Sequence, residues 1–193
     1  LIFNVFENSK KVIFSLTVFY TNLSWHGFLF KQKAADAKAE KTQRDKKFDR
    51  QKNLLKVKLT CVKERMLFSA TYMLKPNLSE YKEAFGEIPA KPNQPIRIEF
   101  DNPDATPHNF VLVQPGCLEE VGLAANEMAK DPEAAKSGQF IPKSKKIIVH
   151  TKMLKQGEKE TLRFKAPRKP GRYPYLCSFP GHWTIMKGVL VVK

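Results

Sequence analysis

A short segment near the carboxyl end of the chain places a thiol, an imidazole and a thioether close together. Cys177, His182 and Met186 stand at C-x4-H-x3-M spacing within the sequence CSFPGHWTIM. Apolar stretches typical of strands flank this segment, YPYL before it and GVLVV after it. Because strands on both sides hold a loop in place, the spacing predicts one loop that presents three ligands to a metal ion.

A second imidazole lies far upstream, at His108 in the sequence TPHNF. Two histidines, one cysteine and a weak axial methionine form the ligand set of a blue-copper electron-transfer site. The chain has 3 Cys, 4 His and 5 Met in 193 residues, so this spacing rarely arises by chance. We therefore expect one copper ion per chain, Cu(I) or Cu(II), held by His108, Cys177, His182 and Met186.

The chain from residue 57 onward is predicted to be a β-sandwich with one helical insertion. Short apolar or alternating segments, separated by Pro, Gly and Asn turns, are typical of this all-β class. The expected strands are 57–61, 67–74, 96–100, 110–113, 147–149, 162–164, 173–177 and 189–192. Apolar residues at helical spacing predict the helix within LEEVGLAANEMAKD, and Pro132 is expected to end it.

From about Pro95 to Lys193 the chain resembles the cupredoxins, and within them the azurin and auracyanin group. The resemblance rests on the His108-Asn109 pair after a strand, on the loop CSFPGHWTIMKG and on the segment VHTKMLKQGEKETLRF. It implies an eight-stranded Greek-key sandwich with one copper at its loop-rich end.

The chain departs from the azurin pattern in three places. Pro107 stands where azurins usually carry a glycine, whose carbonyl approaches the copper, so Pro107 is expected to make at most a weak carbonyl contact. Residues 76–91 resemble an insertion. Cys61 and Cys117 are no clear match for the usual azurin disulfide, and whether they pair or both stay reduced is left open.

The resemblance also implies roles for residues around the ligands. The Asn109 side chain would tie the His108 loop to Ser178. The backbone amides of Asn109 and Phe179 would point at the Cys177 sulfur, and Phe110 would pack beneath the copper. An apolar patch for partner docking would include Ala105, Pro115, Pro180 and Ile185.

The amino-terminal part of the chain divides by composition. Residues 1–30 are apolar and are expected to be an export signal, a membrane anchor or the end of an upstream segment. Residues 31–56 form a basic linker, helical or disordered, and residues 57–193 the cupredoxin domain. Residues 1–30 are the only segment through which membrane contact is possible, and the location is expected to be periplasmic or otherwise extracytoplasmic, with membrane tethering as one alternative.

The net charge of +15 predicts an acidic partner or an anionic surface. We expect redox proteins such as c-type cytochromes and no nucleic acid, since the basic segment has only one aromatic residue for stacking. The chain is not expected to be an enzyme, because a thiol nucleophile would leave Met186 without a role. The alternatives are the copper domain of a larger redox enzyme, or a copper- or zinc-binding protein that transfers no electron.

Overall fold

The computed structural model describes residues 29–62, 67–73 and 81–193, and the chain divides into two units, Leu1–Lys47 and Phe48–Lys193. The predicted signal, anchor or upstream segment lies almost entirely outside the described residues. Among the residues that are described, no helix is both long enough and apolar enough to cross a membrane.

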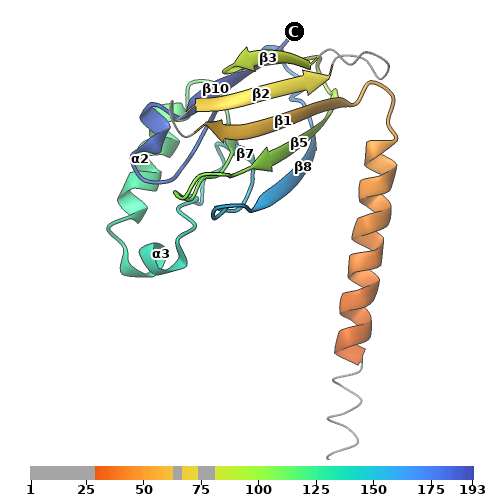
Figure 1. Cartoon of the computed structure of the whole chain (residues 1–193), viewed down its shortest axis with the longest axis horizontal. Coiled ribbons are helices and arrows are strands. Elements are labelled where there is room, and N and C mark those ends of the chain that lie inside the picture. Colours follow the sequence, from red (N-terminus) through yellow and green to blue (C-terminus); the bar gives the residue numbers. More distant parts are fainter. Residues whose placement is uncertain (1–28, 63–66, 74–80) are drawn as a thin grey trace, which may run out of the picture. The chain divides into compact units, whose positions relative to one another are not determined.

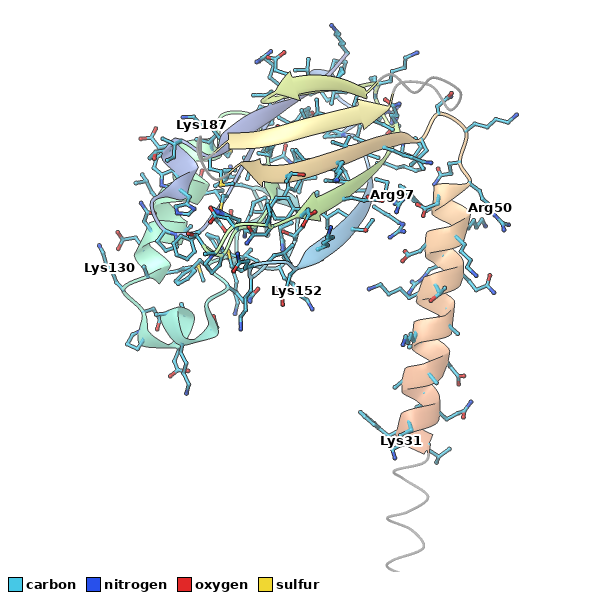
Figure 2. All side chains as sticks on the ribbon, in the orientation of Figure 1. Lys31, Arg50, Arg97, Lys130, Lys152 and Lys187 are labelled. Carbon is cyan, nitrogen blue, oxygen red and sulfur yellow. The ribbon has the colours of Figure 1, made fainter. Side chains whose placement is uncertain are left out.

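A helix covers residues 29–49, where the sequence alone allowed either a helix or disorder. Its composition explains the choice, because Ala, Lys, Glu and Gln are strong helix formers and the segment has no Gly or Pro. Nearly all its side chains are exposed; Lys31 lies near its start and Arg50 just after its end (Figure 2). A helix that is polar all round has no apolar face to bury.

The second unit is a sandwich of two five-stranded sheets, which confirms the predicted fold class (Figure 1). The first sheet has the order β3-β2-β1-β5-β8 and the second the order β4-β10-β9-β6-β7. Strands β1 and β5 run parallel, as do β4 and β10, and the other neighbours run antiparallel. The strands of the first sheet are β1 (Leu55–Val62), β2 (Leu67–Met73), β3 (Tyr81–Phe85), β5 (Pro95–Asp101) and β8 (Lys159–Lys165). Those of the second are β4 (Glu87–Ala90), β6 (Val111–Val113), β7 (Ile147–His150), β9 (Gly171–Leu176) and β10 (Lys187–Val192).

Alternating side chains of the two sheets meet in one core. In β5, Ile96, Ile98 and Phe100 are fully buried, while Arg97 and Glu99 between them are not. Successive side chains of a strand point to opposite faces, so this alternation in the sequence determines which face is inside.

The segment 76–91, which resembles an insertion in the sequence, supplies an edge strand to each sheet. Its first residues lie outside the described part, but β3 pairs with β2 and β4 pairs with β10. Gly86 stands between the two strands with a φ of 82°, which favours glycine, and its carbonyl accepts a hydrogen bond from Val189 N at 2.6 Å. The chain therefore changes sheets at Gly86.

The helical insertion contains two helices, α2 (Leu118–Met128) and α3 (Pro132–Ser137), where the sequence predicted one. Pro132 does not simply end a helix. It occupies the first turn of α3, where its missing N–H is no loss, and the Asp131 side chain caps that helix by accepting from Glu133 N.

Helix α2 packs on the outer face of the second sheet. Its Val121 joins a cluster with Val111, Val113 and Leu176 from β6 and β9. These two strands are therefore buried on both faces, which explains why β6 is a continuous apolar run and does not alternate.

Candidate metal centre

His108 lies between β5 and β6 and is held by backbone pairing rather than by a regular strand. Its N–H donates to Leu154 O at 3.0 Å, and Leu154 N donates back to His108 O at 2.8 Å. The side chain is 2% exposed. A buried imidazole in this position needs a polar partner, because an unpaired polar group is costly in the interior.

The second loop leaves β9 at Cys177 and enters β10 after Met186. It is closed by a hydrogen bond from Cys177 N to Met186 O at 3.0 Å, and Met186 N donates to His182 O at 2.7 Å. His182 begins the short 3-10 helix η1 (His182–Thr184), directly after Gly181 with a φ of 83°. These hydrogen bonds and the turn at Gly181 together fix the backbone positions of Cys177, His182 and Met186.

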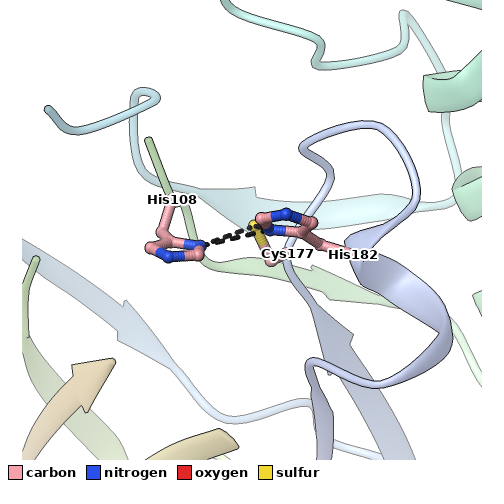
Figure 3. A group of neighbouring side chains, drawn as sticks. All are labelled: His108, Cys177 and His182. Atoms are coloured by element: carbon pink, nitrogen blue, oxygen red, sulfur yellow. Dashed lines mark hydrogen bonds between the residues drawn. The ribbon is translucent and has the colours of Figure 1, made fainter. Parts of the chain in front are cut away.

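The two loops bring three donor atoms together, as Figure 3 shows. Cys177 Sγ lies 3.7 Å from His108 Nδ1 and 3.8 Å from His182 Nδ1, and the two nitrogens are 3.3 Å apart. A point equidistant from the three atoms is about 2.1 Å from each, close to the bond lengths of a metal ion to imidazole nitrogen and to thiolate sulfur. The donor set therefore fits a single metal ion.

Met186 is fully buried at the end of the same loop. The two backbone bonds of the loop hold it next to Cys177 and His182 in the fold. That its sulfur is the axial ligand stays a prediction from the spacing.

The two imidazoles are poised to be neutral. Burial lowers the pKa of His108, against the opposing effect of the Asp104 carboxylate. Burial also lowers the pKa of His182, with a further contribution from the neighbouring His108. Neutral imidazoles are the form that binds a metal ion.

The thiol of Cys177 is fully buried, and burial raises its pKa to about 11. Hydrogen bonds from the backbone amides of Asn109 and Phe179 act in the opposite direction. Without a cation this thiol stays protonated near neutral pH. A bound metal ion would supply the charge that turns it into a thiolate.

Asn109 and Ser178 join the two ligand loops. Asn109 Nδ2 donates to Ser178 Oγ at 2.8 Å, and Ser178 N donates to Asn109 Oδ1 at 2.8 Å. Both residues are fully buried. The Asn109 side chain thus spans from the residue after one ligand to the residue after another.

Aromatic side chains surround the donors. Phe110 is buried with its ring centroid 5.1 Å from that of Tyr175, and the Phe179 ring lies 4.6 Å from the His182 ring. Phe140, from the segment after α3, packs edge-on against Phe179. The Phe179 ring therefore covers part of His182, while the position of Phe110 beneath the copper stays a prediction.

The four residues expected in the docking patch are all at least partly exposed. Ala105, Pro115 and Ile185 are exposed, and Pro180 is half-buried. His182 is also partly exposed, unlike His108 and Cys177. Of the three residues that carry the donor atoms, His182 is therefore the most exposed. Pro107 is half-buried, and a contact of its carbonyl with a metal stays a prediction.

Helix α2 contacts the ligand loop in two places that the sequence did not indicate. The Asn126 side chain accepts a hydrogen bond from Gly181 N at 2.8 Å, directly before His182. Gly122 faces the Trp183 ring so closely that a Cβ built on it would lie 2.3 Å from a ring carbon. An asparagine and a glycine in a helix give no signal of such contacts, which depend on how the helix packs.

Two further residues near the site, which the sequence did not predict, lie in the loop before His108. The Asp104 carboxylate lies 3.5 Å from His108 Nε2, and buried Asn102 donates to both Thr106 O and Leu154 O at 2.9 Å. The only signal in the sequence was the turn-forming segment DNPDATP, since Asn and Asp often hydrogen-bond the backbone of their own turn.

A β-sandwich with a buried cysteine and two histidines converging between its loops defines the class of small mononuclear blue-copper proteins. Residues 88–193 match the family model of copper-binding proteins of the plastocyanin/azurin family. The chain therefore belongs to this family, whose cofactor is a single copper ion.

Individual relatives agree with this assignment. Auracyanin-B of Chloroflexus aurantiacus is 34% identical over 122 residues, which cover 61% of this chain and 48% of the relative. The azurin of Achromobacter denitrificans is 34% identical over 85 residues, covering 43% and 54%. The chain thus spans about half the length of these curated relatives. The solved structure of reduced auracyanin from Roseiflexus castenholzii superposes with a TM-score of 0.51 and 31% identity, covering 72% of this chain and 96% of that one.

Proposed function

We propose that the protein is a one-electron carrier and not an enzyme, with a mononuclear type 1 copper site as its redox centre. The observation that carries the proposal is the triangle formed by Cys177 Sγ, His108 Nδ1 and His182 Nδ1. Copper bound there would alternate between Cu(I) and Cu(II) and so store one electron. Met186 would provide the weak axial contact.

The surrounding residues support this function by holding the donors still. His108 is fixed by its pairing with Leu154, and the two loops are joined through Asn109 and Ser178. Ligands that keep one geometry in both oxidation states need little rearrangement when an electron moves. Burial of His108 and Cys177 also limits the access of water to these two ligands.

Two other functions remain as alternatives. In the first alternative, the chain is the copper domain of a larger redox enzyme. In the second, it is a copper- or zinc-binding protein that transfers no electron. A structural zinc site usually has four strong donors, and among the described residues the cluster offers one thiol and two imidazoles. Thioether sulfur is a poor ligand for zinc, so Met186 favours copper.

Titration of the purified protein with Cu(II) tests the proposal. We expect one equivalent to give an intense blue absorption band and a narrow copper hyperfine splitting. Cys177→Ser removes the thiolate and abolishes the colour, whereas Cys117→Ser serves as the matched control and keeps it, since Cys117 is a free thiol at the start of α2. A colourless wild-type protein with an intact Cys177 thiol would refute the proposal.

For partners, we propose other redox proteins, such as c-type cytochromes with an acidic surface. The net charge of +15 supports steering of acidic proteins, and the patch of Ala105, Pro115, Pro180 and Ile185 would make the close contact near His182. No nucleic acid is proposed as a partner. Stopped-flow electron exchange with acidic and basic cytochromes tests this, and equal rates for both would contradict it.

For location, we propose an extracytoplasmic protein with membrane contact only through residues 1–30. Residues 31–56 would act as a basic linker, mostly as the helix 29–49, and residues 57–193 as the cupredoxin domain. Fractionation of cells that produce the whole chain, or a variant without residues 1–30, tests the arrangement. An unchanged membrane fraction after this deletion would contradict it.

A further inference from the structure

The loop before His108 presents a carboxylate to the ring nitrogen that faces away from the other donors. His108 Nδ1 lies 3.3 Å from His182 Nδ1 and 3.7 Å from Cys177 Sγ. Its Nε2 lies 3.5 Å from Asp104 Oδ2. In a neutral imidazole that binds a metal through Nδ1, the proton is on Nε2, so the N–H is on the side of the ring where an acceptor with a full negative charge lies.

The Asp104 side chain is fixed in the loop. It accepts hydrogen bonds from the backbone amides of Ala105 and Thr106, and the N–H of Asp104 donates to Asn102 Oδ1 at 3.0 Å. Asn102 in turn donates from Nδ2 to Leu154 O, and Leu154 is the backbone partner of His108. The backbone of Asp104 and the backbone of His108 are therefore connected through the hydrogen bonds of Asn102 and Leu154.

The charge of Asp104 is also poorly screened. Its side chain is only 13% exposed and that of His108 is 2% exposed. Charges near the surface are weakened by water and salt, whereas a partly buried pair keeps most of its interaction. A turn-forming aspartate would need only its backbone hydrogen bonds, so the contact with Nε2 goes beyond what the turn requires.

We propose that Asp104 is a positioning residue for the metal centre, which orients His108 and whose negative charge favours oxidised over reduced copper. The inference rests on the proposed copper site. A carboxylate on the outer nitrogen makes an imidazole a stronger donor, and a nearby negative charge stabilises the oxidation state with the higher positive charge. Asp104 thereby lowers the reduction potential.

Three variants separate charge from hydrogen bonding. Asp104→Asn keeps the size and an acceptor oxygen but removes the charge, while Asp104→Leu removes both. Asp101→Asn is the matched control, because it removes a carboxylate close by in the sequence that pairs with Lys159 at 2.8 Å. All three are loaded with copper and titrated with redox mediators at one fixed pH.

We expect Asp104→Asn to shift the equilibrium at least tenfold toward Cu(I), a rise of 59 mV for one electron, with the blue band retained. The shift persists between about 0.1 M and about 1 M salt, since the pair is partly buried. Asp104→Leu raises the potential further and broadens the copper spectrum as the ring loses its orientation, and Asp101→Asn stays close to wild type. A potential of Asp104→Asn equal to that of Asp101→Asn would overturn the inference.

A second measurement needs no variant to fold. Nitrogen-15 NMR of the wild-type protein with Zn(II) in the site reports the Nε2–H proton of His108. We expect a slowly exchanging proton at low field, the signature of donation to a carboxylate; a rapidly exchanging or absent Nε2–H signal would overturn the inference. Failure of the copper proposal is distinct, because the wild-type protein would then stay colourless with Cu(II).

Discussion

Asn109 and Ser178 exchange two hydrogen bonds of 2.8 Å each across the gap between the two ligand loops. Asn109→Ala leaves the Ser178 N–H and hydroxyl without their partner in a fully buried place. We expect a loss of about 2–3 kcal/mol in the free energy of unfolding, measured by urea denaturation of the metal-free protein.

Ser178→Ala is the matched partner of that substitution. It removes one hydrogen bond and leaves the bond from Ser178 N intact, so we expect a smaller loss of about 1 kcal/mol. With copper bound, Asn109→Ala should also broaden the blue band, because the distance between the loops is no longer fixed. Equal losses for both variants would show that the pair does not act as a bridge.

Met186→Leu tests the axial position. Leucine fills nearly the same volume in a fully buried site, so we expect less than about 1.5 kcal/mol of lost stability. The reduction potential should rise, because a weak sulfur donor that supports Cu(II) is removed. Voltammetry of this variant beside Met128→Leu, on helix α2, measures the effect. Complete loss of copper, or an unchanged potential, would argue against weak axial ligation.

Gly122→Ala tests whether α2 supports the ligand loop. The added Cβ would lie 2.3 Å from a Trp183 ring carbon, so the ring next to His182 must move. We expect a loss of about 1–3 kcal/mol in stability and an altered copper spectrum. Leu123→Ala, at an exposed position of the same helix, should change stability by less than about 0.5 kcal/mol. A copper spectrum of Gly122→Ala identical to that of the wild type would show that the packing of α2 does not affect the metal centre.

Asp49 gives the stability a dependence on acid pH. Its carboxylate accepts two hydrogen bonds of 3.0 Å from Arg163, and these, with the charges of Arg97 and Lys56, hold the pKa below its usual 3.8. A carboxyl pKa that is lower in the folded state stabilises the protein above pH 3.8, and this contribution is lost as the pH falls through the folded pKa.

We therefore expect Asp49→Asn to lose about 0.5–1 kcal/mol near neutral pH and little at pH values below the folded pKa. Unfolding curves of both proteins across this range measure the difference. Glu40→Gln, exposed on the same helix, is the control. A difference that stays constant down to the lowest pH would show that the ion pair does not stabilise the fold.

Ile185→Asp tests the docking patch beside His182. The side chain is 49% exposed, so the substitution should leave the fold and the blue colour intact. We expect slower electron exchange with a cytochrome, because a charge at the contact must be desolvated on binding. Leu123→Asp, equally exposed but on α2, is the control. An equal rate for wild type and Ile185→Asp would place the contact elsewhere.

Much of the fold could be predicted from local patterns. The alternation in Ile96, Ile98 and Phe100 identified a strand and its buried face, and the helical spacing around Val121 identified α2. The edge strands β3 and β4 were not predicted, because a short edge strand depends on a partner strand from elsewhere in the chain. Pro132 was expected only to end a helix, since the capping of α3 by Asp131 requires a turn that no periodicity indicates.

The close spacing of Cys177, His182 and Met186 could be read from the chain alone, because all three lie in one loop between strands. Only the tertiary structure brings His108 to within 3.7 Å of Cys177 Sγ, and places Asn126 against Gly181 and Asp104 against His108. In a helix or a strand, side chains follow a fixed period, so their spacing in the sequence shows which of them share a face. An irregular loop has none, so the packing of distant segments and the loop's own hydrogen bonds decide which side chains meet there.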